Sequence, residues 1–107
     1  MPLTRAQNDQ IYNHILTVTF DLGVGSPLDI ALREHMLDSP NELSTLTDDI
    51  IENLEYDDTS DPDDLRLNMR LTIYYKRTLQ SFTRFLLYRI SAGVNSPVTV
   101  EDWLAIS

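Results

Sequence analysis

Acidic and basic side chains are the groups in this sequence that can bind or react, and they lie in separate segments of the chain. The segment from Glu42 to Asp64 carries ten acidic side chains and no basic one, whereas the segment from Arg66 to Arg89 carries six basic side chains and no acidic one. Charges separated in this way attract each other or a partner, and they govern recognition and association rate more than the fold. The pattern therefore indicates binding rather than a reaction.

The run Asp57-Asp58-Thr59-Ser60-Asp61 has the oxygen-rich composition of a calcium-binding loop. An EF-hand loop needs glycine at its sixth position and a bidentate acid at its twelfth. Counted from Asp57, these positions hold Pro62 and Asn68. We therefore expect a solvated linker that caps a helix, and no metal site.

No catalytic or cofactor motif is present in the sequence. The two histidines, His14 and His35, fall on different predicted helices and lack the acidic pattern of a metalloprotease helix. The chain has no cysteine, which excludes disulfides, thiolate zinc sites and cysteine nucleophiles, and its three glycines form no phosphate-binding loop. We expect no enzymatic activity, no cofactor and no bound metal.

Several segments carry the signals of a helix start. A Ser, Thr or Asp side chain accepts hydrogen bonds from the free amides of the first turn, proline suits the first helical position, and an acid there favours the positive end of the helix dipole. The strong starts are Ser26-Pro27-Leu28-Asp29, Ser39-Pro40-Asn41-Glu42 and Asp61-Pro62-Asp63-Asp64, and the weaker ones are at Thr4, Thr47 and Thr99.

The spacing of apolar residues predicts helices after these starts. They cover about residues 5–20, about residues 27–37, two short segments around Leu43 and Ile51, and a C-terminal segment at about residues 97–106. The last long segment, from Asp63 to about Ser91, contains no proline or glycine, and as one helix it would be ~43 Å long. No strand is predicted, because the only β-rich piece, Thr17 to Phe20, continues the helical periodicity of residues 5–20 and lacks alternation.

The long predicted helix has three distinct sets of side chains at helical spacing. The core face comprises Leu71, Tyr75, Leu79, Phe82 and Leu86. A basic stripe on the opposite side comprises Arg66, Arg70, Arg77 and Arg84. A second apolar surface comprises Met69, Ile73 and Leu87. Such a helix either bridges two subdomains or packs on another protomer. Alternatively, the segment Val98–Ile106 with Trp103 folds back and covers part of the second apolar surface.

Composition agrees with one folded domain over residues 1–107. Apolar residues make up 42% of the chain, which is typical of globular proteins in spite of the net charge of −9. No apolar run approaches the ~20 residues of a membrane span, and no signal peptide follows Met1. We expect an all-α bundle of five or six helices that makes no membrane contact and is intracellular, cytoplasmic or nuclear.

Residues 26–91 resemble a sterile alpha motif domain. Short helices meet at capped corners before a long final helix, with the motif Ser39-Pro40-Asn41-Glu42-Leu43, the motif Leu46-Thr47-Asp48-Asp49-Ile50, and Leu32, His35 and Leu54. The resemblance implies a helical protein-interaction domain. The glycine-containing turn that usually precedes the family's long helix is replaced here by residues 56–62, so the family's end-to-end polymer surface is not carried over.

The whole chain is similar to the amino-terminal regions of algal copia-type retroelement polyproteins. The similarity lies in Ser26-Pro27-Leu28, Leu46-Thr47, Leu54-Glu55-Tyr56 and Asp102-Trp103. It implies a Gag-like assembly segment that is part of a longer polyprotein. The sequence lacks the zinc knuckle with which such polyproteins bind RNA, so that task would lie elsewhere.

We predict non-enzymatic protein–protein association, with another copy of the chain as the expected partner. The predicted partner-binding residues are Arg66, Met69, Arg70, Ile73, Arg77, Arg84 and Leu87. The complementary acidic surface comprises Asp48, Asp49, Glu52, Glu55, Asp57 and Asp58. The alternative is nucleic-acid binding, because evenly spaced cations can follow a phosphate backbone, although ten nearby carboxylates oppose it.

Overall fold

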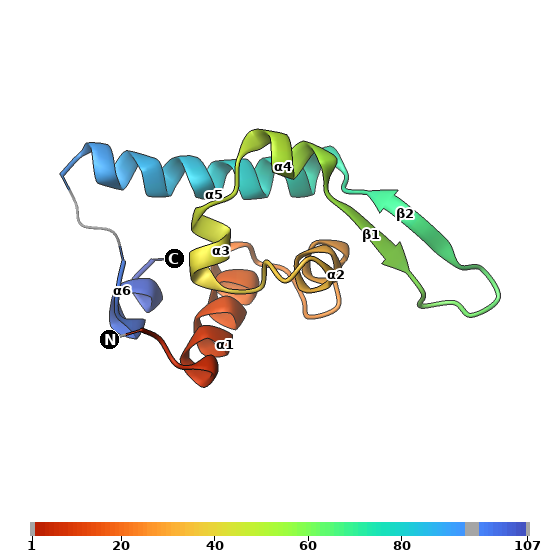
Figure 1. Ribbon diagram of the computed structural model, residues 1–107, viewed down its shortest axis with the longest axis horizontal. Coiled ribbons are helices and arrows are strands. Elements are labelled where there is room, and N and C mark those ends of the chain that lie inside the picture. The colour runs from red at the N-terminus through yellow and green to blue at the C-terminus, as the bar shows by residue number, and fades with distance from the viewer. Residues whose placement is uncertain (1, 94–96, 107) are drawn as a thin grey trace.

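The computed structural model describes residues 2–93 and 97–106, and this part of the chain is mostly helical (Figure 1). The helices are α1 (Arg5–His14), its π-helical continuation η1 (Ile15–Thr19), α2 (Pro27–Glu34), α3 (Pro40–Ser44), α4 (Asp48–Asn53), α5 (Ile73–Ser91) and α6 (Val100–Leu104). Two strands, β1 (Glu55–Asp58) and β2 (Arg66–Arg70), pair as an antiparallel hairpin. The fold is therefore helical in the main, and the all-α prediction is corrected by this small sheet.

Side-chain caps start the helices at five of the six predicted positions. The side chains of Thr4, Ser26, Ser39, Thr47 and Thr99 each accept a hydrogen bond from the amide three residues later. The exception is Asp61, whose carboxylate accepts from the amide of Asp63 at 2.9 Å within the hairpin loop, and no helix starts there. The predicted helix starts are therefore confirmed at the five positions where buried apolar residues follow the cap.

The predicted 43 Å helix is wrong in its first third. The helix α5 begins at Ile73 and has 19 residues, so that it is roughly 28 Å long. The preceding residues form β2 because Leu65, Leu67 and Met69 alternate with polar residues, which is the period of a strand. The prediction that the chain contains no strand is wrong for the same reason.

The hairpin contains a bulge on β2. Tyr56 lies opposite Met69 and Asp58 lies opposite Arg66, so two residues of β2 face one residue of β1 between these pairs. Asn68 occupies the bulge with a φ of 56°, a left-handed conformation that asparagine tolerates better than most residues. Its amide donates to Oδ1 of Asp57 at 2.9 Å, which holds the bulge across the hairpin.

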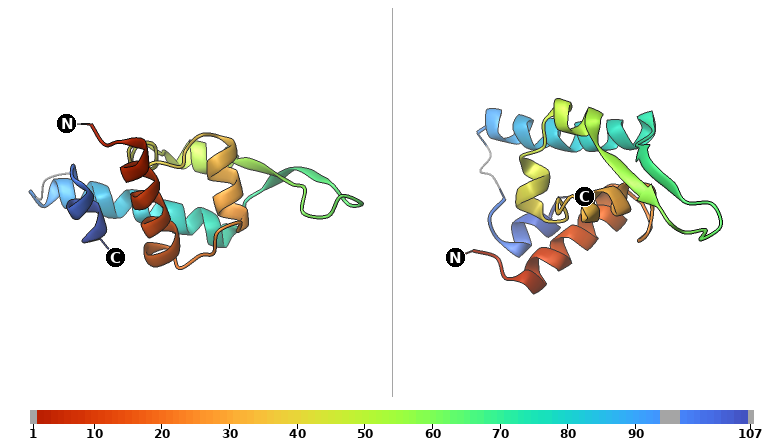
Figure 2. Two further views of the ribbon diagram at one scale, coloured as in Figure 1. Left: turned by 90° about the horizontal axis from the view of Figure 1, so that it is seen from below. Right: turned by 45° about the vertical axis from the view of Figure 1, so that its right-hand side comes forward.

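The core lies where α5 crosses the helices of the N-terminal half (Figure 2). The predicted core face of α5 is confirmed, because Leu71, Leu79, Phe82 and Leu86 are buried and Tyr75 is half-buried. Trp103, only 3% exposed, brings α6 into the same core, in contact with α1. Both ends of the described chain therefore pack in one body of helices.

The hairpin projects from this body as an arm (Figure 1). The principal extents are 50 × 28 × 21 Å, and the radius of gyration is 14.4 Å. A compact domain of this length has a radius of gyration of ~13 Å. The excess follows from the hairpin, whose outer end lies away from every helix in both further views (Figure 2). Over the described residues, no helix combines the length and the apolar character needed to cross a membrane.

Candidate protein-binding site

The predicted basic stripe is divided between two elements. Arg66 and Arg70 lie on β2, whereas Arg77 and Arg84 lie on α5, so the four arginines do not form one helical row. Two of them face carboxylates of their own chain: Arg66 is 3.3 Å from Asp64, and Arg84 is 3.7 Å from Asp48. The single stripe predicted from helical spacing is therefore wrong, because the strand interrupts the helix that would have carried it.

The predicted acidic surface is likewise divided, between α4 and β1. Asp48, Asp49 and Glu52 lie on α4, and Glu55, Asp57 and Asp58 lie on β1. Glu52 accepts a hydrogen bond from Nζ of Lys76 at 2.8 Å, which lowers the pKa of Glu52 below its usual value. The α4 carboxylates therefore meet the basic helix within one chain, which is one of the two arrangements expected from the charge pattern.

The β1 carboxylates organise the hairpin. Asp58 accepts from the hydroxyl of Ser60 at 2.6 Å and from its amide at 3.1 Å, and these two bonds lower the pKa of Asp58. Glu34 of α2 accepts from the amide of Asp57.

Among the residues that the structure describes, no cluster of three or more His, Cys, Asp or Glu side chains is arranged to hold a metal ion.

The predicted second apolar surface is not continuous either. Met69 is half-buried on β2, whereas Ile73 and Leu87 are exposed on α5. The segment Val98–Ile106 folds back, but its Trp103 enters the core beside α1 instead of covering Met69. The structure instead forms a surface beside α5 that includes Ile73 and Arg77 of the predicted set, while its other residues were not predicted.

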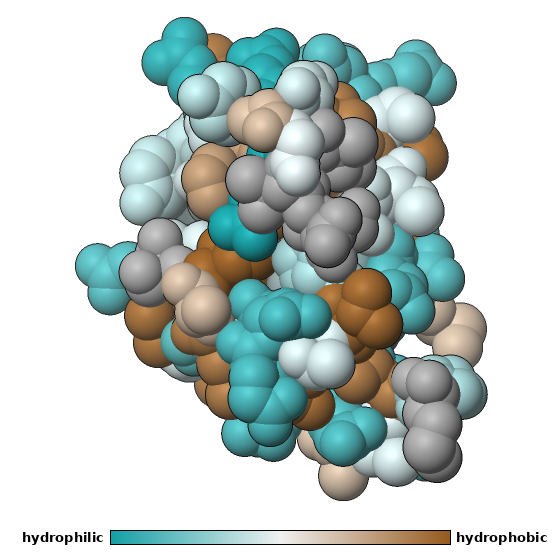
Figure 3. Space-filling view, turned by 90° about the vertical axis from the view of Figure 1, so that its left-hand side faces the viewer, coloured by the Kyte–Doolittle hydropathy of each residue, from teal (hydrophilic) through white to brown (hydrophobic). Residues whose placement is uncertain are grey.

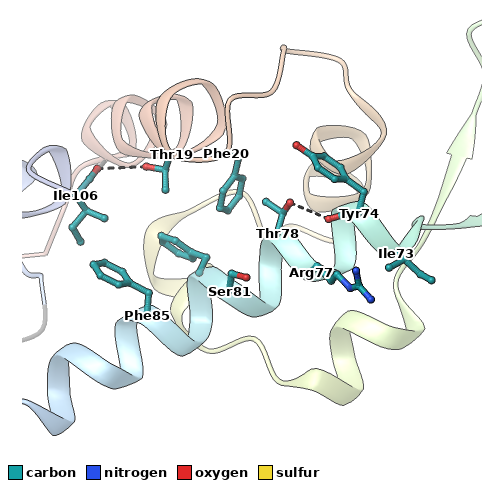
Figure 4. Close-up of a pocket in the computed structure, with 10 residues that line it drawn as sticks. Thr19, Phe20, Ile73, Tyr74, Arg77, Thr78, Ser81, Phe85 and Ile106 are labelled. Atoms are coloured by element: carbon teal, nitrogen blue, oxygen red, sulfur yellow. Dashed lines mark hydrogen bonds between the residues drawn. The ribbon is translucent and has the colours of Figure 1, made fainter.

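This surface is a groove between α5 and the end of the first helical segment (Figure 4). Along α5, Tyr74, Thr78, Ser81 and Phe85 recur at helical spacing and lie within about 60° of one another. Phe20 and Ile106 approach from the opposite side. The groove has a volume of about 650 Å³. We call it the α5 groove.

The middle of the α5 groove is deep because small side chains lie between large ones. Thr78 and Ser81 occupy the centre of the row, with the rings of Tyr74 and Phe85 toward its ends (Figure 4). The ring of Phe20 meets the ring of Phe82 edge-to-face, with centroids 5.4 Å apart, on the core side. Small side chains at the centre and large rings toward the ends therefore leave a recess in the middle of the groove.

Two of the hydroxyl groups in the α5 groove donate to carbonyls of the chain itself. The hydroxyl of Thr78 donates to the carbonyl of Tyr74 at 3.0 Å, and the hydroxyl of Thr19 donates to the carbonyl of Ile106 at 3.4 Å. Both threonines therefore offer mainly their methyl groups to the groove.

Figure 3, which views the end of the molecule where α5 finishes, shows apolar side chains gathered between hydrophilic ones above and below.

A π-helical turn shapes the wall opposite α5. Within and just after η1 the helix widens, and the amide of Phe20 donates to the carbonyl of Ile15 at 2.8 Å across five residues. Asp21 then adopts a φ of 54°, which turns the chain sharply away from the helix axis. π-helical turns are rare and are frequent at functional sites. Sequence periodicity predicts a helix here but does not distinguish the π form.

The α5 groove carries positive charge. Arg77 is the one charged residue among the described residues that line it. The guanidinium of Arg89 lies 5.9 Å from the ring centroid of Phe85, at one end of the groove. In a chain with a net charge of −9, the α5 groove is therefore a place of local positive charge.

Three of the large side chains that line the α5 groove are exposed to solvent. Ile73 and Tyr74 are 64% and 62% exposed, and Phe85 is 43% exposed.

No protein-family model, curated protein or solved structure matches this chain. The geometry and chemistry of the α5 groove are therefore the basis on which a function can be inferred.

Proposed function

We propose that this protein is a non-enzymatic association module that binds protein, and that its partner is another copy of itself. The observation that carries the proposal is the α5 groove, in which exposed aromatic and aliphatic side chains surround a depression of about 650 Å³. Aromatic residues and arginine are enriched at the energetic centres of protein interfaces, and this groove combines both. Assembly is also what the two resemblances imply.

The accessible surface area supports association. The chain exposes 6842 Å², whereas a compact monomer of its mass exposes about 6100 Å². The excess reflects the elongated shape of the molecule. An interface of standard size would cover ~800 Å² of each copy.

Apolar burial supplies the affinity, and the charges guide the encounter. Exposed ion pairs contribute only ~0 to 1 kcal/mol each, while buried apolar area contributes ~25 cal/mol per Å². Arg77 and Arg89 attract an acidic partner and orient it at the groove. Salt is therefore expected to slow association more than it weakens the final complex.

Light scattering after size-exclusion chromatography, from micromolar to submillimolar concentration, tests the proposal. We expect a concentration-dependent increase in mass for the wild type, and its loss on replacing Phe85 by aspartate. The matched control is Leu87→Asp, because Leu87 is also exposed on α5 but does not line the groove. A monomer at every concentration would end the self-association proposal.

The nucleic-acid alternative is tested in the same series. Binding to labelled single-stranded RNA at low salt, weakened by Arg77→Glu and by Arg70→Glu but unaffected by Phe85→Asp, would replace the protein partner with a phosphate backbone. We expect no such retention. Arg66 and Arg84 already face carboxylates, and the row of cations that motivated this alternative is divided between β2 and α5.

A further inference from the structure

We propose that the outer half of the hairpin of one copy occupies the α5 groove of a second copy. This inference rests on the proposed self-association and names the element that mediates it. We define the arm as residues 57–67, which comprise the end of β1, the loop and the start of β2. The inference follows from the apolar pattern of the arm, its charge, and its position relative to the groove.

The apolar pattern of β2 extends further than its burial. Leu65, Leu67, Met69 and Leu71 alternate with polar residues in the sequence, but the bulge at Asn68 places Arg66, and not Leu67, on the same face of the hairpin as Met69. Leu71 is buried and Met69 half-buried, but Leu65 and Leu67 are 57% and 58% exposed. The half of the strand next to the helices is thus covered by its own chain, whereas the outer half presents two leucines to solvent.

The base of the hairpin is anchored on α2. Nε2 of His35 lies 2.7 Å from the carbonyl oxygen of Glu55. A carbonyl oxygen can only accept, so Nε2–H is the donor of this hydrogen bond. The carboxylate of Glu34 accepts from the amide of Asp57, with an Oε2 to N distance of 3.1 Å. These contacts fix the direction in which the arm leaves the body, so the arm is presented in a set orientation.

Charge makes the arm complementary to the groove. Between Asp57 and Leu67 the sequence holds five carboxylates and one guanidinium, Arg66. The groove offers Arg77 in its lining and Arg89 beside it, and no carboxylate among its described lining residues. An acidic arm with two exposed leucines therefore has the chemistry of the partner that the groove selects.

The arm cannot reach the groove of its own chain. Only Leu71 and Thr72 separate β2 from α5, and the hairpin leaves the start of α5 in the direction away from the helices (Figures 1 and 2). The two surfaces can meet only between copies. Reciprocal insertion of two arms gives a closed dimer, and one-way insertion gives an open chain of copies.

Two exposed substitutions separate the arm from the groove. The arm variant is L65S/L67S, and its matched control is L87S, which removes an equally exposed leucine from α5 outside the groove. The groove variant is S81E, which fills the centre of the groove and offsets the charge of Arg77, and its control is Q10E on the exposed surface of α1. Far-UV circular dichroism and thermal melting are expected to match the wild type for all four variants.

Sedimentation velocity on the full chain measures association of each variant and of their mixture. We expect L65S/L67S and S81E each to weaken self-association by about tenfold or more, and the controls to stay within about twofold of the wild type. We also expect an equimolar mixture of L65S/L67S and S81E to regain a mixed dimer, because it combines one intact arm with one intact groove.

The outcomes distinguish this inference from the proposed function. If the wild type associates and L65S/L67S associates equally well, the arm is overturned while self-association stands. Loss of association in both variants without recovery in the mixture would indicate direct packing of α5 on α5 and would also overturn the arm. A wild type that stays monomeric at all concentrations overturns the proposed function and the arm together.

Discussion

The hydroxyl of Tyr12 donates a hydrogen bond to Oδ1 of Asp29 at 2.7 Å, and this bond joins α1 to α2 inside the core. Asp29 is 2% exposed and also accepts from Nε of Arg33 at 2.8 Å and from the amide of Gly25 at 2.8 Å. The guanidinium of Arg33 lies over the Tyr12 ring, 4.9 Å from its centroid. The buried carboxylate is thus fully surrounded by donors, as a buried charge requires.

Replacing Asp29 by alanine is expected to lower the free energy of unfolding by about 2–3 kcal/mol. The change leaves the Tyr12 hydroxyl and the Gly25 amide without their acceptor, and such groups are costly when buried. Tyr12→Phe is the control, since it removes one donor and is expected to lose only about 1 kcal/mol. Urea unfolding followed by circular dichroism measures both. Equal losses for the two variants would contradict the central role of the carboxylate.

Alkaline pH is expected to destabilise the protein through Tyr12. Burial, followed by the hydrogen bond to Asp29, raises the pKa of Tyr12 well above its ordinary value. Because the folded pKa is the higher one, the contribution is fully present below the unfolded pKa of ~10 and is lost as pH rises above it. Ultraviolet difference spectra should show that one of the five tyrosines fails to ionise until the chain unfolds. In Tyr12→Phe this late-ionising fraction should vanish.

Acid is expected to loosen α6. The amides of Thr99 and Val98 donate to the carboxylate of Asp102 and lower its pKa. A lowered folded pKa gives stability that is present above the unfolded pKa of ~3.9 and is lost as pH falls through the folded value. The fluorescence of Trp103, the sole tryptophan, reports this change. The difference in stability between wild type and Asp102→Ala should be fully present above about pH 5 and should shrink as the pH falls through the folded pKa.

The ion pair between Glu52 and Lys76 is expected to matter more than the pair between Asp48 and Arg84. The first joins atoms 2.8 Å apart and uses a lysine whose side chain is 14% exposed, whereas the second spans 3.7 Å between two exposed side chains. Poorly solvated charges lose more when their partner is removed. Glu52→Gln should therefore lower the urea midpoint more than Asp48→Asn, and high salt should reduce that difference. Equal midpoints would contradict the ranking.

Local rules in the sequence sufficed for most of the helical architecture. Caps such as Ser26 and Thr99 and the apolar spacing along α5 depend on neighbours within four residues, so they can be recognised without tertiary information. The same reasoning failed at residues 63–72. Arg66 and Arg70 are spaced four apart, which suits a helix, while Leu65, Leu67 and Met69 alternate, which suits a strand. Pairing with β1 decides between the two periods.

The α5 groove could not be predicted from the sequence either, because its two sides come from segments that are far apart in the chain. Its α5 side, with Tyr74 and Phe85, follows a helical spacing that the sequence shows, but Phe20 and Ile106 reach it from segments far apart in the chain. By itself the sequence determined a capped helical chain with separated charges, because capping, periodicity and net charge are properties of neighbouring residues. Only the tertiary structure decided where the charges pair and where apolar side chains stay exposed, because those outcomes depend on contacts between distant segments.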